Sequence, residues 1–182
     1  MVRLWRSCLF TVMLGTTASP RIAAGQAQRA CPAPVLARLA PIRGAWIVRW
    51  LDRLAPRKYA TSMARSTIEM AAGGCGLLER FAGRRAGHRF EALTLIAPAG
   101  DDSLQRMWQD SEHGPLLLFT ADLRADPIRF EWSRNLHGRV LRLRMTYLML
   151  ATEGFITETE LSPDDGQTWQ LVSRQEYRRI SS

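Results

Sequence analysis

The chain has 182 residues, of which 46% are hydrophobic and 23% are charged. This composition excludes a wholly disordered chain and allows one domain with a sizeable core. The formal net charge is +8, and Lys58 is the one lysine among the 25 basic residues. The arginines are spread along the chain in runs of two at most, which favours a solvated surface, with an anion-binding face as the alternative, and we expect no nucleic-acid partner.

The first residues have the pattern of a secretory signal. Arg3 and Arg6 precede an apolar run at 8–15 that is too short to span a bilayer, and small residues lead to a cleavage site near Ala27. We therefore expect residues 1–27 to be removed and the mature protein to be periplasmic or secreted, without stable insertion in a membrane. An uncleaved N-terminal anchor is the alternative.

Export makes the cysteines informative. Cys8 leaves with the signal, and Cys31 and Cys75 remain as a pair in an oxidising compartment. We expect a disulfide that ties the N-terminal arm, residues 28–44, to the third strand, with two unpaired buried thiols as the alternative. The absence of a Cys-x-x-Cys motif argues against zinc-ribbon and thioredoxin-type sites.

A short helical pattern at 34–40 is followed by strands. Val35, Leu36 and Leu39 lie on one side of that helix, and Pro41 is expected to end it. Beyond it, apolar and polar residues alternate with a period of two between short turns. The predicted strands are 45–51, 61–71, 75–82, 88–97, 103–110, 116–123, 128–134, 139–150, 155–162 and 168–178. The link at 52–60 is long and could continue as helix.

Ten strands without intervening helices predict an all-β, antiparallel up-and-down barrel over residues 45–180, preceded by the short helix. Closure into a barrel hides the edges of such a sheet. The late strands support closure, because one face of each is apolar and the other carries Arg and Glu, which we expect to form weak cross-strand ion pairs outside. The residues assigned to the inner face include Tyr147, Met149, Trp169, Leu171 and Tyr177.

The stretch at 162–169, Ser-Pro-Asp-Asp-Gly-Gln-Thr-Trp, predicts a tight hairpin turn. Ser162 and Asp164 can bond the amides of the turn, Gly166 can take a positive φ, and Trp169 can lie under the turn as an apolar plug. Its spacing resembles the Asp-box hairpin of sialidase-type propellers, which implies an element of architecture away from the chemistry. A single copy cannot build a propeller, which needs repeated blades.

Several short motifs occur one after another along the chain. Gly-Ala-Trp at 44–46 opens a strand, Gly-Gly-Cys-Gly-Leu-Leu-Glu follows at 73–79, Trp-Gln-Asp-Ser at 108–111, and Tyr-Arg-Arg at 177–179 follows the last hairpin. In this order, and after a short helix in an exported chain, they resemble the bacterial exported lipocalin-like domains of unknown function. The resemblance covers residues 35–179, implies a calycin-type barrel and transfers no catalytic residue.

Strand parity turns several polar groups toward the interior. Glu79 shares the apolar face with Arg134, and either face of the strand containing Arg106 brings polar groups inward. Buried charges are costly unless they are paired. One interpretation is a structural Glu–Arg pair, or a bulge that moves these groups outside. The other is that they orient a ligand in an otherwise apolar and aromatic pocket.

We therefore expect an exported barrel that holds a small amphipathic or acidic molecule in its cavity. The predicted ligand-binding residues are Glu79, Arg106, Trp108, Trp132, Arg134, Tyr147 and Tyr177. The alternatives are an enzyme that uses Glu79 as its cavity carboxylate, and a scaffold or interaction protein with a filled core. We expect no catalytic residue, metal or cofactor, with haem ligated by His113 or His137 as the alternative.

Overall fold

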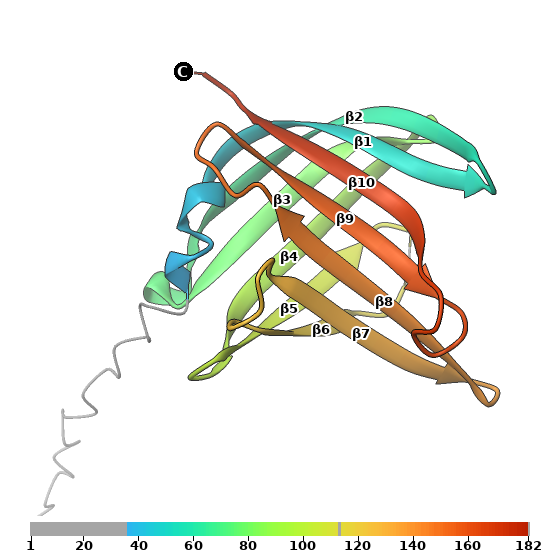
Figure 1. Ribbon diagram of the computed structural model, residues 1–182. Coiled ribbons are helices and arrows are strands. Elements are labelled where there is room, and N and C mark those ends of the chain that lie inside the picture. The colour runs from blue at the N-terminus through green and yellow to red at the C-terminus, as the bar shows by residue number, and fades with distance from the viewer. Residues whose placement is uncertain (1–35, 113, 182) are drawn as a thin grey trace, which may run out of the picture.

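Ten antiparallel strands close into a barrel in the structure, a computed structural model that describes residues 36–112 and 114–181. Neighbours in the sequence are neighbours in the sheet, and β1 pairs with β10 to complete the barrel (Figure 1). The strands are β1 (Gly44–Ala55), β2 (Lys58–Ala71), β3 (Gly76–Arg85), β4 (His88–Gly100), β5 (Ser103–Asp110), β6 (Leu117–Asp122), β7 (Arg129–Leu136), β8 (Arg139–Leu148), β9 (Gly154–Ser162) and β10 (Gln170–Arg179). The predicted fold class and strand order are confirmed.

The N-terminal helical segment closes one end of the barrel. Leu36 and Ala37 are helical, and the 3₁₀ helix η1 (Ala40–Ile42) follows. Pro41 therefore does not end the helical segment as expected, because proline is tolerated in a first helical turn, where its missing N–H would have no partner. The predicted signal segment and Cys31 lie outside the described residues.

Apolar side chains fill the barrel beneath this segment. Leu39 and Ile42 are buried against Trp46, whose indole Nε1 donates to the Ile42 carbonyl at 2.9 Å. The ring of Phe155 meets Trp46 edge-on at 5.1 Å and stacks on Tyr177 at 4.0 Å between centroids. Such packed rings add favourable contacts beyond the burial of their area. We call this half of the interior the closed end.

The link at 52–60 is a tight hairpin, so the helical alternative is wrong. β1 and β2 keep pairing beyond Asp52 and Ala60, and the chain reverses at Pro56 and Arg57, which has a φ of 60°. The sequence signal is weak here because the hairpin reaches past the enclosed part of the barrel. Beyond Asp52, its residues therefore have no buried face that would impose alternation.

A bulge in β10 overturns the inner assignment of two residues. The register with β9 shifts between Leu171 and Ser173, so that Val172 and Ser173 both line the interior. Leu171 and Trp169 then fall on the outer face, where the guanidinium of Arg144 lies 4.0 Å from the centroid of the Trp169 ring. One extra residue in a strand moves the side chains on the N-terminal side of the bulge to the opposite face of the sheet.

Met149 is also on the wrong face in the prediction. It follows the end of β8, has a φ of 50°, and its side chain is 70% exposed. The outer face of the late strands does carry the predicted cross-strand ion pairs, which are Arg49–Glu176, Arg144–Glu160 and Arg174–Glu158. Pairs as exposed as these contribute roughly 0–1 kcal/mol each.

Candidate functional site

The interior opposite the N-terminal segment holds a cavity of about 520 Å³. Figure 1 shows η1 at one end of the barrel and the β1–β2 and β7–β8 hairpins at the other, which we call the open end. The cavity wall is drawn from both early and late strands, from Trp50 in β1 to Tyr177 in β10. Its volume falls within the range of about 300–1,000 Å³ that small-molecule sites occupy.

Most of the predicted ligand-binding residues line this one cavity. They are Glu79, Arg106, Trp108, Trp132, Arg134 and Tyr177. Tyr147 does not line it: its ring is buried one layer deeper, 5.7 Å from the ring of Phe130. Strand parity correctly predicts that Tyr147 faces inward, but it does not indicate how far along the barrel axis a residue lies.

Arg106 is the most informative residue of the wall. Its side chain comes from β5, is 4% exposed, and donates from Nη2 to Thr94 Oγ1 at 3.2 Å. Within the described part of the chain, its Nε and Nη1 are buried and have no hydrogen-bond partner. The guanidinium also lies 5.5 Å from the ring of Phe119. A buried cation with unmet donors is costly. Both nitrogens are covered by neighbouring atoms, so an acceptor group in the cavity would pair with them after a shift of the side chain.

Glu79 lies near this cation but is held by hydroxyl groups. The carboxyl is 8% exposed, and its Oε1 accepts from Ser66 Oγ at 2.7 Å and from the Tyr177 hydroxyl at 3.0 Å. The hydrogen-bond partners described for Glu79 therefore differ from the Glu–Arg pair that strand parity allows. Ser66 and Thr94 were not predicted, although Thr94 is the one polar residue among Phe90, Ala92 and Ile96 on the inner face of β4, a signal that could have identified it.

The two inner tyrosines stay protonated at neutral pH. Burial, reinforced by the charge of Glu79, raises the pKa of Tyr177 well above its usual value. Burial also raises the pKa of Tyr147 to about 12, although the positive charge of Arg106 opposes the shift. The Tyr177 hydroxyl is 3.1 Å from Gln175 Oε1 as well. Its single proton can serve Glu79 or Gln175 but not both at once.

The mouth of the cavity is bridged by Arg85. Its Nε donates to Asp52 Oδ2 at 2.5 Å and its Nη1 to Glu112 Oε2 at 2.9 Å, and its guanidinium lies 5.3 Å from the ring of Trp50. Arg134 also lines the mouth, with an exposed side chain. This differs from the expectation that it is buried beside Glu79, because Arg134 lies near the end of β7, past the enclosed depth.

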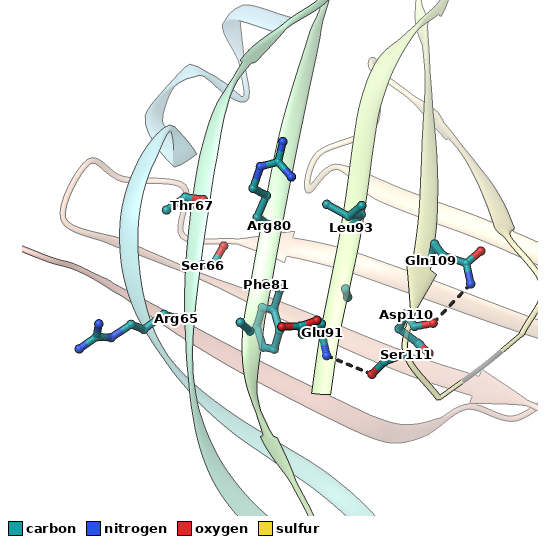
Figure 2. Close-up of a pocket in the computed structure, with 12 residues that line it drawn as sticks. Arg65, Ser66, Thr67, Arg80, Phe81, Glu91, Leu93, Gln109, Asp110 and Ser111 are labelled. Atoms are coloured by element: carbon teal, nitrogen blue, oxygen red, sulfur yellow. Dashed lines mark hydrogen bonds between the residues drawn. The ribbon is translucent and has the colours of Figure 1, made fainter. Parts of the chain in front are cut away.

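A shallower depression lies on the outer face of β2 to β5. Arg65, Arg80 and Glu91 are among its exposed residues, and the backbone N–H of Glu91 donates to Ser111 Oγ at 3.1 Å. Figure 2 shows that Arg65 and Arg80 extend away from one another. Because its charged groups do not converge on a common point, this depression lacks the geometry of a binding site.

The turn at 162–169 has the hydrogen bonds that its sequence predicts. Ser162 Oγ accepts from the Gly166 N–H at 2.7 Å and donates to Asp164 Oδ1 at 2.8 Å. Asp164 also accepts from the backbone N–H and the hydroxyl of Thr168, which lowers the pKa of its carboxyl. Gly166 has a φ of 91°. Trp169 packs against the turn at Gly166, and its Nε1 donates to the Gly166 carbonyl at 3.1 Å.

Of the two histidines considered for haem, His137 lies within the described residues. Among the described residues, no group of three His, Cys, Asp or Glu side chains has the arrangement of a metal site. His137 is exposed in the β7–β8 turn with a φ of 52°, and His113 lies outside the described residues. No described helix is long and apolar enough to cross a bilayer.

Comparison with known proteins identifies a fold. No family model matches the chain. No curated protein matches it either. The structure is similar to the crystal structure of Rv2717c from M. tuberculosis, with a TM-score of 0.56 and 13% sequence identity, over 81% of this chain and 98% of that chain. At this identity the likeness concerns the fold alone, and the chain is a closed ten-stranded barrel with which a lipocalin-like architecture agrees in outline.

Proposed function

We propose that the chain is an exported protein that binds a small amphipathic or acidic molecule in the cavity at the open end of its barrel. The observation that carries the proposal is Arg106, a buried guanidinium on the cavity wall with two nitrogens that lack a partner in the described structure. Buried polar groups almost always have partners, and a ligand acceptor would supply the missing one.

The cavity suits a molecule with an acidic head and an apolar body. The head would accept hydrogen bonds from Arg106 at the floor, since a charge-assisted bond is about twice as strong as a neutral one. The body would contact Trp108, Trp132 and Met145, which line the same cavity. Glu79 already accepts two hydrogen bonds, so its role would be to set the orientation of Tyr177 and to favour a donor group on the ligand.

A fluorescent anionic probe tests this function. We expect 8-anilinonaphthalene-1-sulfonate to bind with a strong gain in emission, and Arg106→Met to weaken that binding by roughly ten-fold or more, as the loss of a charge-assisted bond implies. Arg65→Met, on the outer wall, is the matched control and should bind as the wild type does. If Arg106→Met keeps its unfolding midpoint and binds the probe equally well, Arg106 does not hold the ligand.

Export is tested separately from binding. The pattern at 1–27 supports a mature chain that begins near Gln28, and the same compartment supports a Cys31–Cys75 disulfide. On the loop-entropy model such a bond contributes about 3–4 kcal/mol. Intact mass of the secreted protein, measured with and without reduction, should show the loss of the leader and a gain of two hydrogens on reduction. Two thiols that alkylate in unreduced, denatured protein would remove the disulfide from the proposal.

A further inference from the structure

The β1–β2 hairpin exposes apolar and basic side chains together. Leu54 and Tyr59 are 52% and 44% exposed. Arg57 and Lys58 lie between them in sequence, at the turn, and both are exposed. Figure 1 shows this hairpin at the open end of the barrel. Large apolar side chains flanked by cations are typical of segments that lie in a membrane interface.

The open end also gathers cations that have no acidic partner. They come from three hairpins, and none of them forms an ion pair within the described chain. These residues are Arg53, Arg57, Lys58, Arg84, Arg134 and Arg139. At the closed end, Arg38 pairs with Asp126 and Arg124 with Asp102, whereas Arg43 and Arg179 form no ion pair in the described structure. The mouth of the cavity therefore carries several cations without acidic partners, beside Arg85, which pairs with Asp52 and Glu112.

We propose that the open end of the barrel docks on the surface of an anionic lipid bilayer, with the β1–β2 hairpin as its main contact. The cations would lie against lipid phosphates, and Leu54 and Tyr59 would enter the interface. Charge complementarity selects an anionic surface, and the two exposed apolar side chains favour a bilayer over a nucleic acid. Docking in this orientation brings the mouth of the cavity to the place where amphipathic acids accumulate. The docking itself does not require the cavity to be occupied.

Vesicle sedimentation of the full mature chain tests the docking surface. We expect binding to phosphatidylcholine vesicles that contain about one third phosphatidylglycerol, weakening as salt rises, and little binding to phosphatidylcholine alone. The double variant Arg57→Glu with Lys58→Glu should lose at least about ten-fold in vesicle affinity, because each cation near the surface contributes. Arg139→Glu, on a separate hairpin, should give a smaller loss in the same direction.

Matched controls separate a docking face from net charge. Arg65→Glu with Arg178→Glu makes the same change in charge at two exposed arginines that form no ion pair in the described structure and lie on other faces. This control should change vesicle affinity by less than about two-fold if docking is local, since charges beyond about 8–10 Å are screened. For the apolar contribution, Leu54→Ser should weaken binding, and Leu118→Ser should not, although Leu118 is 45% exposed on β6.

The outcomes that overturn the proposal are distinct. Equal losses in the two double variants would mean that net charge alone drives binding. No binding to anionic vesicles, or equal binding to neutral ones, would remove the anionic surface as the partner. Displacement of the protein from vesicles by a short DNA duplex, with loss of duplex binding in the hairpin variant, would make this a nucleic-acid face instead. Unfolding midpoints of all variants, followed by circular dichroism, check that each is folded.

Discussion

The two ends of the barrel interior are built from the same strands but are used differently. At the closed end, Leu39, Ile42 and Trp46 belong to a buried cluster that includes the stacked rings of Phe155 and Tyr177. At the open end, Glu79 and Arg106 stand at the floor of a cavity of about 520 Å³. The alternation of apolar and polar residues along the strands is the same at both ends. The difference arises from side-chain volume and from the segment that covers one end, so a barrel pattern does not by itself distinguish core from site.

The largest effect should come from removing the main aromatic residue of the closed end. Trp46→Ala deletes a fully buried indole and its hydrogen bond to Ile42, which should cost roughly 3–5 kcal/mol. Trp108→Ala removes an indole of the same size from the half-buried cavity wall and should cost much less. Denaturant unfolding followed by circular dichroism gives both values. Equal losses would show that the open end is packed as tightly as the closed one.

Alkaline pH should destabilise the packing around Tyr147, which lies between the closed end and the cavity. The pKa of Tyr147 is about 12 in the folded chain against 10.0 for the ordinary side chain. Its contribution is fully present below pH 10 and is lost as pH rises through the folded value, which amounts to about 3 kcal/mol. Tyr147→Phe removes this titration, so the free energy of unfolding of the variant should fall less between pH 10 and 12. Identical pH slopes for the two proteins would contradict the assignment.

Substitutions in the turn at 162–169 test whether hydrogen bonds within turns, rather than side-chain packing, stabilise the open end. Gly166 has a φ of 91°, which a β-branched residue adopts only with strain. Gly166→Val should therefore destabilise the protein by roughly 1–3 kcal/mol. Gln167→Val places the same side chain at the next, exposed position and serves as the control in the same unfolding experiment. A wild-type midpoint for Gly166→Val would mean that this turn does not hold β9 and β10 in register.

The smallest effect concerns the same turn at acid pH, where the carboxyl of Asp164 titrates. Hydrogen bonds from Thr168 hold the pKa of Asp164 below its ordinary value. A depressed carboxyl contributes stability that is present above its unfolded pKa of about 3.9 and is lost as pH falls through the folded value. The stability difference between wild type and Asp164→Asn should therefore be constant near neutrality and shrink below about pH 4. A difference that does not change with pH would place the effect of the substitution elsewhere.

The strands could be predicted because their evidence is local. Short turns rich in Gly, Pro, Asn and Asp separate the alternating segments, so all ten strands lie close to their predicted positions. The inward orientation of Glu79 also follows from alternation within one strand, whereas for Arg106 alternation left the inner face of its strand open. These two residues carry most of what the sequence indicates about the site.

The errors have a different origin. Leu171 and Trp169 point outward because a single bulge reverses parity, and nothing in the residues around Val172 signals it. Tyr147 lies too deep to line the cavity, and Arg134 lines it with an exposed side chain near the mouth. Depth along a barrel depends on the tilt and stagger of all its strands, which no one strand encodes. The partners of Glu79 come from β2 and β10, so they too required the assembled barrel.

The pairing of β1 with β10 has a kinetic consequence. Trp46 faces Arg179 across this seam, so the barrel is completed by its first and last strands. Contacts between such distant parts of a sequence form slowly, because a long loop must be ordered before they contribute. Until β10 arrives, β1 and β9 each present an unpaired edge that can recruit another chain. Nascent or truncated forms that lack β10 should therefore aggregate, while in the finished barrel the pairing of β10 with β1 and β9 covers both of these edges.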